Sequence, residues 1–499
     1  MRVVFLGIGA EQIGVELLSA VLKRAGHDVR LVFNPSLFDD RFQLRIPTLA
    51  RRFDREAALV RDAIALAPDV VAMSVLSSTY QSGLAMATAI REGTGAKIIF
   101  GGVHPSAVPE VVIAEPAVDA VCVGEGDEAF PAMLAAWEAG NPEDPIANMW
   151  FKRTNGDIVR GPQAGFLQDL DSLPFADKAL YADEFDVGDP YMTITGRGCP
   201  YRCTFCFNNF WAKLPQRSGV KAGRYVRQRS VAHVIGELSA AKKRWRLRFV
   251  DFEDDIFTVD KPWLKAFLEA YRAEIGVPWM CLSHPKYVDD DIVRWMKEAG
   301  CTWVQIGIQS LDEQYKHAKM RRYESVGDVA WALDAFRKAG IGVRGDHIFG
   351  GPGEPADSQE VARAFYVAHP PKRISTYWMT WLPGVEMTQQ AVDAGVLTTE
   401  DVDRLNRGLA PTFHEFGAVR DPAEMRRFAN YEALFRILPG LPTGLRERAR
   451  AEWFNGVPLP ALKAFSMAGD IALGFANRHP SHRQYAQHYV RQVIKHVMG

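Results

Sequence analysis

The sequence lacks long apolar runs, a charge surplus and a set of paired cysteines, and each lack excludes a class of protein. The formal net charge is −1 over 499 residues, which indicates no surface for nucleic acid or an anionic membrane. No window approaches the run of roughly 18 apolar residues that a membrane span requires. The apolar run after Met1 is too short for a secretory signal and continues as a strand and a helix. We therefore expect a cytoplasmic protein with no membrane span and no nucleic acid partner.

Cysteine is scarce, and three of the six cysteines are isolated in the chain, at Cys122, Cys281 and Cys301. Such a set indicates a reducing compartment rather than a disulfide framework. The other three, Cys199, Cys203 and Cys206, lie within eight residues in the segment 196–209. The glycines and the proline of that segment are typical of a loop, and the preceding residues 191–195 read as a short strand.

The clustered cysteines form the pattern C-x-x-x-C-x-x-C. Thiolate is the soft ligand that iron–sulfur clusters require, and three thiolates leave one iron of a four-iron cluster open. Two alternatives remain. A structural zinc site normally has four protein ligands, and no fourth Cys or His lies within twenty residues of the three. Buried cysteines also act as small apolar side chains, which the polar neighbours of these three do not favour.

Residues 1–140 alternate β-branched apolar runs with helical stretches, which predicts an α/β fold with a doubly wound, Rossmann-like parallel sheet. Ligands of such sheets bind at the carboxyl ends of the strands. A dinucleotide is one alternative, but Gly7, Gly9 and Gly14 match G-x-G-x-x-G only in part, and no acidic residue ends the second strand. We expect strands at 2–6, 28–33, 69–74, 97–100 and 117–123, with helices near 11–25, 50–67, 79–93, 106–115 and 127–139.

A second alternation occupies residues 189–385 and predicts a partial (β/α)6 barrel, with active residues at the carboxyl ends of its strands. The expected strands are 191–195, 247–252, 278–283, 302–308, 342–348 and 373–379, with helices near 230–243, 261–274, 288–299, 326–339 and 356–368. Between the two alternations, residues 141–188 are rich in Pro, Asp and Gly and predict a linker with a hairpin around Asn155 and Gly156. Residues 386–499 predict a helical C-terminal region.

The cysteine pattern, with Phe205 directly before the last cysteine, resembles the signature of the radical S-adenosylmethionine (SAM) superfamily. The resemblance implies that Cys199, Cys203 and Cys206 bind a [4Fe–4S] cluster, whose open iron holds the amino and carboxylate groups of SAM. It also implies further SAM contacts at the barrel rim. These are Phe205, one of Glu253, Asp254 and Asp255 at the amino group, Gln309 and Ser310 at the ribose and methionine portions, and Arg344 at the carboxylate. The alternative for an acidic residue in 253–255 is a helix N-cap.

Residues 1–140 resemble the cobalamin-binding domain that precedes many radical SAM cores, and Gly350–Pro355 is similar to a segment of cobalamin-dependent members. In that domain's D-x-H-x-x-G loop a histidine ligates cobalt, whereas here Glu11 stands at the histidine position. The resemblance therefore implies cobalt without a histidine from this loop. His104 is either a substitute ligand or a loop residue. The implied cobalamin contacts are Gly9, Glu11, Gly14, Ser74, Leu76, Gly101, Gly102, His104, Gly124, Glu125 and Gly126.

Aromatic residues follow the sixth predicted strand of the barrel, at Tyr377, Trp378 and Trp381. They are candidates to line a bulky apolar substrate, and the alternative is that they pack the C-terminal region.

The resemblance covers about residues 1–385 and implies an enzyme that cleaves SAM reductively and uses cobalamin. Methylation of an unactivated carbon in a small molecule, as in class B radical SAM methyltransferases, is the leading hypothesis. One alternative is oxidative cyclisation or rearrangement of a bulky, tetrapyrrole-like substrate, as in the anaerobic magnesium-protoporphyrin monomethyl ester cyclase family. Another is a sensor without turnover. The expected partner is a low-potential electron donor such as flavodoxin or ferredoxin.

Overall fold

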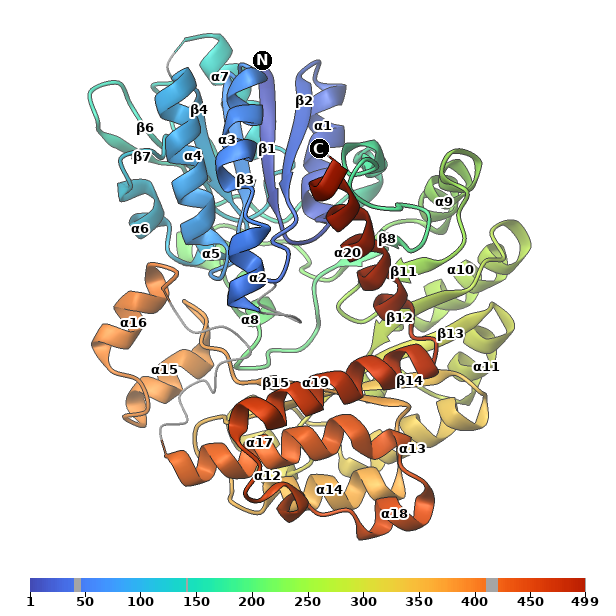
Figure 1. The fold of residues 1–499 in the computed structure, drawn as a ribbon. Helices are drawn as coiled ribbons and strands as arrows, with labels where there is room; N and C mark the ends of the chain where they lie inside the picture. Colours follow the sequence, from blue (N-terminus) through green and yellow to red (C-terminus); the bar gives the residue numbers. More distant parts are fainter. Residues whose placement is uncertain (40–45, 141, 410–420, 499) are drawn as a thin grey trace.

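The computed structural model describes residues 1–39, 46–140, 142–409 and 421–498. It contains two parallel α/β layers, with the N-terminal sheet above a six-stranded barrel sheet and the C-terminal helices below (Figure 1). The predicted α/β class and the order of the parts are confirmed.

The N-terminal sheet has seven strands in the order β2-β1-β3-β4-β5-β6-β7, of which the first five are parallel. Its two faces bury separate apolar clusters, which fits the near-continuous apolar runs of these strands. The strands are β1 (Arg2–Ile8), β2 (Asp28–Asn34), β3 (Val70–Ser74), β4 (Lys97–Gly101), β5 (Ala120–Cys122), β6 (Met149–Lys152) and β7 (Ile158–Arg160). The helices are α1 (Ile13–Arg24), α2 (Pro47–Arg52), α3 (Glu56–Ala65), α4 (Tyr80–Thr94), α5 (Val103–Ala107), α6 (Pro109–Ala114) and α7 (Ala129–Glu138).

Two features of this half differ from the sequence-based expectation. The hairpin β6–β7 pairs antiparallel with β5, so the sheet continues to Arg160 and past the expected boundary at residue 140. The helix expected at 106–115 is divided at Val108, whose backbone angles before Pro109 (φ −134°, ψ 55°) lie outside the helical region. A residue before proline avoids the helical region for steric reasons, which accounts for the break.

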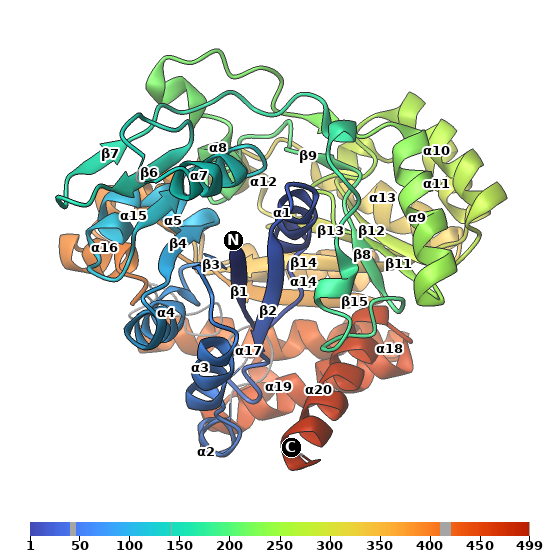
Figure 2. The same ribbon diagram turned by 90° about the horizontal axis from the view of Figure 1, so that it is seen from above.

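The barrel sheet has six parallel strands in the order β15-β14-β13-β12-β11-β8, as the alternation predicted. Its strands are β8 (Tyr191–Thr193), β11 (Val250–Phe252), β12 (Trp279–Ser283), β13 (Cys301–Gln309), β14 (Gly342–Phe349) and β15 (Arg373–Trp378). The connecting helices lie along the outside of the strands (Figure 2). Side-chain caps such as the Ser325–Asp328 capping box fix the starts of most of them. They are α9 (Val231–Trp245), α10 (Lys261–Glu274), α11 (Asp290–Glu298), α13 (Val326–Lys338) and α14 (Ser358–Ala368).

Between β8 and β11 the chain forms a two-stranded ribbon, β9 (Gly196–Arg197) and β10 (Arg227–Gln228), which sequence analysis missed. A short helix, α8 (Phe207–Trp211), follows the cysteine segment, and its Phe210 is buried among apolar residues of the N-terminal sheet. The cysteine segment is therefore attached to both halves of the protein. Short turns of helix in this region and around it are η1 (Leu170–Ser172), η2 (Lys178–Leu180), η3 (Pro215–Ser218), η4 (Pro285–Tyr287), α12 (Glu313–Tyr315) and η5 (Lys316–Met320).

The C-terminal helices share the barrel's apolar core, in which Phe428 and Phe435 of α17 pack with Phe349 and Trp378. Helix α20 runs from the barrel toward the N-terminal domain (Figure 1), and its Arg483 pairs with Asp189. These elements are α15 (Glu386–Asp393), α16 (Thr399–Asn406), α17 (Pro422–Ile437), η6 (Leu438–Gly440), α18 (Thr443–Arg448), η7 (Ala451–Phe454), α19 (Leu459–Ala476) and α20 (Pro480–Met498).

Within the described residues, α19 is the one helix whose length and composition suit a membrane span, with a mean hydropathy of 1.2. It comes closer to such a span than the sequence analysis expected. Its Asp470 accepts two hydrogen bonds from Arg373 of β15, at 2.9 and 2.6 Å. The helix also packs against α17 and β15. These contacts make α19 part of the cover of the barrel in this structure.

Candidate active site

The cysteine segment begins just after β8, and an aspartate that follows the neighbouring strand β11 holds its start. Asp254 accepts hydrogen bonds from the Thr195 backbone N–H, at 3.0 and 2.9 Å, and from its hydroxyl, at 2.8 Å. Gly196 and Gly198 follow. A Cβ on Gly196 would lie 2.6 Å from the Arg227 carbonyl oxygen, and one on Gly198 would lie 2.3 Å from that of Tyr225. The two glycines therefore let the segment run against the ribbon's second strand.

Cys199, Cys203 and Cys206 lie together at this edge of the barrel. Burial raises the pKa of the Cys199 thiol to about 12 and of the Cys206 thiol to about 11, and it raises that of Cys203 as well. Thiolates in such surroundings need positive charge beside them, which an iron–sulfur cluster provides. In the described part of the chain, no three His, Cys, Asp or Glu side chains converge on a single ion. The donor set fits a cluster, whose thiolates bind different irons, better than a zinc ion.

A buried charge network lies behind Cys203, and sequence analysis missed it. Arg322 hydrogen-bonds with the Cys203 sulfur and donates to Glu324 at 2.8 Å. Lys316 and His284 lie 3.3 and 3.4 Å from the same carboxylate. Burial raises the pKa of Glu324, but these cationic and donor groups bring it well below its usual value. The only signal in the sequence was an Arg-Arg pair after the fourth barrel strand, which does not tell a buried arginine from an exposed one.

The three acidic candidates for the SAM amino group face different surroundings. Asp254 is 6 % exposed and is used to hold Thr195, and burial raises its pKa to about 7 against those hydrogen bonds. Asp255 is exposed beside the cysteine segment, where the Asn208 side-chain amide donates to it at 2.7 Å. Glu253 is also exposed but faces Asp251 and Arg344 inside the barrel. Asp255 is thus the exposed candidate whose carboxylate contacts the cysteine segment itself, through Asn208 and the Gly198 backbone.

Gln309 and Ser310 end β13 at the same rim. Gln309 has a backbone φ of 65°, in the left-handed region that glycine favours, and the register with β14 shifts beside it. Such strain gathers at functional positions. Ser310 is 3 % exposed, and its hydroxyl accepts a hydrogen bond from the Asp312 backbone N–H at 3.3 Å. Gln309 is half-buried at this rim, while Ser310 takes part in a turn.

Arg344 points into the barrel, where its guanidinium donates to the Tyr377 hydroxyl at 2.7 Å and lies 3.5 Å from Asp346. Asp346 also accepts a hydrogen bond from Gln305 at 2.6 Å. One oxygen each of Asp251 and Asp346 is buried without a hydrogen-bond partner. The interior of the barrel is therefore polar.

The aromatic residues after β15 separate into different environments. The hydroxyl of Tyr377 accepts a hydrogen bond from Arg344 in the polar interior of the barrel. Trp378 is 2 % exposed, packs against Phe349 and Phe428, and donates its indole N–H to Glu432 at 3.1 Å. This placement matches the packing alternative for Trp378. Trp381 lies in a small apolar cluster against which Phe205 packs, and its indole nitrogen has no hydrogen-bond partner.

At the carboxyl end of β1, Glu11 is bound by a lysine from the segment between the two sheets. Lys178 donates to Glu11 at 2.6 Å and to Glu16 at 2.7 Å, and all three side chains are buried. Gly9, with a φ of 79°, and Gly14 would have open space around an added Cβ. This loop has room for a flat ligand, and its carboxylate is already engaged.

The loops after β3 and β4 meet closely. A Cβ on Gly102 would lie 2.9 Å from the Val75 nitrogen and 3.0 Å from the Ser74 hydroxyl. Leu76 is 40 % exposed at this edge, next to the Gly101 end of β4. His104 is fully buried, its Nδ1 lies 2.9 Å from the Ser77 hydroxyl, and its Nε2 has no partner. Burial lowers the pKa of His104 to about 4, so the ring is neutral at neutral pH.

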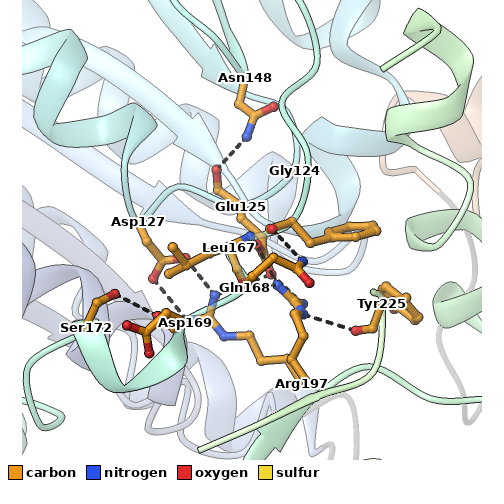
Figure 3. A network of polar contacts seen from close by, with 12 residues as sticks. Gly124, Glu125, Asp127, Asn148, Leu167, Gln168, Asp169, Ser172, Arg197 and Tyr225 are labelled. Atoms are coloured by element: carbon orange, nitrogen blue, oxygen red, sulfur yellow. Dashed lines mark hydrogen bonds and ion pairs between the residues drawn. The ribbon is translucent and has the colours of Figure 1, made fainter. Parts of the chain in front are cut away.

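The loop after β5 contacts the cysteine segment rather than only its own sheet. Glu125, between Gly124 and Gly126, accepts hydrogen bonds from Arg227 at 3.0 and 2.8 Å, and Asp127 accepts two from Arg197 at 2.6 and 3.0 Å (Figure 3). A buried, paired contact of this kind fixes the loop to the ribbon. Sequence analysis assigned Glu125 to cobalamin, and the structure shows its carboxylate bound to arginine.

Two family models match this chain, one over each of its two α/β parts. Residues 193–365 match the family model described as the radical SAM superfamily, and residues 7–134 match the B12 binding domain. An uncharacterized methyltransferase of Pyrococcus horikoshii is 26 % identical over 372 residues, covering 72 % of this chain and 74 % of its own. The anaerobic magnesium-protoporphyrin IX monomethyl ester cyclase of Cereibacter sphaeroides is 24 % identical over 426 residues, covering 81 % and 65 %.

Among solved structures, the fold is similar to that of OxsB, a cobalamin-dependent S-adenosylmethionine radical enzyme solved with aqua-cobalamin and S-adenosylmethionine bound. The TM-score is 0.66 at 13 % sequence identity, and the match covers 100 % of this chain and 79 % of OxsB. The similarity extends over both sheets and the C-terminal helices.

Proposed function

Because the chain belongs to the radical SAM superfamily and carries a B12-binding domain ahead of its core, it is a cobalamin-dependent radical SAM enzyme, and we propose that it methylates an unactivated carbon. Its cofactors are a [4Fe–4S] cluster, SAM and cobalamin. The proposed substrate is a small molecule. The observation that carries the methylation proposal is the engagement of Glu11 by Lys178, supported by the methyltransferase relative.

The Glu11–Lys178 pair lies in the loop that would face cobalamin when it is bound. The loop after β1 offers a carboxylate that is already paired, and no histidine. The axial ligands of a metal strongly influence its reactivity. Without a strong axial donor, the cobalt of cobalamin would release a methyl group more easily. This favours an enzyme that gives a methyl group away.

When bound, the cluster and cobalamin supply reductive cleavage of SAM and carriage of the methyl group. The chain's own side chains hold and shield these groups. Cys199, Cys203 and Cys206 bind three irons, and Asp255 takes the SAM amino group, because it is the exposed carboxylate that contacts the cysteine segment. Asp254 keeps the segment in place through Thr195.

We propose further contacts to SAM at the same rim of the barrel. Gln309 is placed to reach SAM from the end of β13, and Phe205 packs at the edge of the cysteine segment. Arg344 would meet the SAM carboxylate only from within the barrel, where it also contacts Tyr377. The loops with Gly9, Gly102 and Gly124 form the proposed binding site for cobalamin. All three glycines have a positive φ that larger residues rarely adopt, and an added Cβ would also be crowded at Gly102 and Gly124.

A low-potential carrier such as flavodoxin or ferredoxin is the proposed electron donor, in the cytoplasm. The support is a set of exposed cations around the cysteine segment. Arg202 lies between two of the cysteines and donates to the Cys199 carbonyl at 3.1 Å. Arg224, Lys286 and Lys319 are exposed on neighbouring segments. Such a surface suits an acidic carrier protein.

The second candidate is oxidative cyclisation or rearrangement, which the similarity to the cyclase of Cereibacter sphaeroides favours. The two are separated by anaerobic turnover of the reconstituted enzyme with SAM labelled in its methyl group. Methylation puts the label in the organic product. An unlabelled product with fewer hydrogens would support the cyclase reaction and exclude the methylase.

A further inference from the structure

The ribbon that leads into the cysteine segment carries two arginines directly opposite each other. Arg197 of β9 and Arg227 of β10 are Cα partners in an antiparallel pair. Like charges in this position repel one another and destabilise the pair. The ribbon has only two residues in each strand, so its own backbone hydrogen bonds offer little to offset that repulsion. Something outside the ribbon must hold the two guanidinium groups together.

The N-terminal domain supplies the balancing charges. Asp127 binds Arg197 through two hydrogen bonds, and Glu125 binds Arg227 through two more while lying 3.4 Å from Arg197. The exposed fractions of these side chains are 6 % for Asp127, 2 % for Arg227, 16 % for Glu125 and 17 % for Arg197. Two positive and two negative charges thus form a neutral, largely buried group, which we name the interdomain junction.

The junction lies between the two cofactor sites. The 124–127 loop follows β5, at the edge of the sheet where the cobalamin loops gather, and Arg197 is two residues before Cys199. Additional bonds tie the loop on its far side, where Asn148 donates to the Glu125 carbonyl at 3.0 Å and the Leu167 N–H donates to the Glu125 carboxylate at 2.9 Å (Figure 3). Movement of this loop must therefore move the ribbon.

We propose that the interdomain junction couples the two cofactor sites, so that cobalamin held against the 124–127 loop stabilises the cluster-binding conformation of the cysteine segment. Arg197 is then a positioning residue, which acts on the cluster through the backbone of Gly198 and Cys199. When the loop is ordered by cobalamin, Asp127 and Glu125 hold the arginine pair. When the loop loosens, the repulsion between Arg197 and Arg227 opens the ribbon.

The test measures iron release from the reconstituted holoenzyme to a ferrous chelator, with and without cobalamin. In the wild type we expect cobalamin to slow iron release about 5- to 10-fold, in the range of coupling between sites. Asp127→Asn removes one charge of the junction and is expected to abolish most of this protection while cobalamin absorbance stays with the protein. Glu128→Gln is the matched control, because Glu128 is exposed and adjacent, and it should keep the wild-type protection.

Arg197→Gln tests the same coupling from the ribbon side and leaves the N-terminal domain intact. It should also lose the protection, and Arg197→Lys should regain part of it because the charge returns without the two-bond geometry. Equal protection in the wild type and both neutral variants would overturn the proposal and indicate that cobalamin merely shields the cluster. Absence of protection in the wild type would overturn it as well. Neither result bears on methyl transfer, which is measured separately.

Discussion

The ammonium group of Lys178 lies 2.6 Å from the Glu11 carboxylate, and both side chains are almost inaccessible to solvent. Glu16 shares the same ammonium at 2.7 Å. Burial lowers the pKa of Lys178, but the two carboxylates raise it above its usual value, and burial raises the pKa of Glu16. The lysine comes from the segment between the two sheets, so this contact fixes the loop after β1 to the rest of the protein.

Lys178→Met should destabilise the protein strongly, because it leaves two buried carboxylates without a cation. The expected loss is about 3–5 kcal/mol in the free energy of unfolding, measured by denaturant titration at neutral pH. Lys23→Met is the control, since Lys23 also pairs with a carboxylate, Asp177, but is 42 % exposed. It should cost about 0–1 kcal/mol. Equal losses in the two variants would show that the buried triad is not important for stability.

Cys203→Ala should abolish the absorbance of the cluster and the formation of 5′-deoxyadenosine under a low-potential reductant. Cys281→Ala is the matched control, because Cys281 is also buried but lies on a barrel strand away from the cysteine segment. The control should keep both signals. A full cluster spectrum in Cys203→Ala would refute the assignment of the cysteine ligands.

Asp255→Asn should weaken SAM binding to the cluster-replete protein by about 10-fold or more, since a hydrogen bond to a charged group contributes about 1.5–3 kcal/mol. Equilibrium dialysis with SAM measures the change. Asp254→Asn should act mainly on stability, because Asp254 accepts from Thr195 rather than facing a ligand. If Asp254→Asn weakened SAM binding and Asp255→Asn did not, the two roles would be reversed.

Buried histidines should make the protein sensitive to mild acid. Burial lowers the pKa of His347 to about 4, and the ring contacts Tyr366 and Gln359 in its neutral form. The unfolded chain binds the proton near pH 6.5, so the folded state loses stability as the pH falls from 6.5 toward 4. At about 1.4 kcal/mol per pH unit, this one group accounts for about 3 kcal/mol.

Denaturant titrations at several pH values check this prediction. His347→Gln removes the titrating group and should flatten the dependence between pH 6.5 and 4, although His104, whose pKa burial also lowers to about 4, contributes a similar slope. An unchanged slope in the variant would mean that His347 is not the group responsible.

Sequence analysis found the features that repeat along the chain. Alternating strands and helices have a period, so both sheets were predicted correctly. The three cysteines have a spacing that makes them the predicted cluster ligands, and this assignment stays a prediction. The β9–β10 ribbon has no detectable period because each strand has two residues. Whether Asp254 or Asp255 faces the cysteines depends on a turn, in which side chains follow no regular alternation.

Contacts between residues distant in the sequence also could not be predicted. Glu11 meets Lys178 from 167 positions away, and Arg322 reaches Cys203 from another barrel unit. Only the packing of the two halves brings these charges together, and the number of alternative pairings among 59 basic and 60 acidic residues is too large for spacing to select one.

If the proposed methylation is right, the enzyme takes a methyl group from SAM onto cobalamin and also cleaves SAM at its cluster. The most direct measurement incubates the reduced, anaerobic holoenzyme with SAM carrying a deuterated methyl group and analyses the extracted corrinoid and nucleosides by mass spectrometry. We expect a labelled methyl group on the corrinoid, with both S-adenosylhomocysteine and 5′-deoxyadenosine formed. An unlabelled corrinoid and 5′-deoxyadenosine without S-adenosylhomocysteine would contradict it.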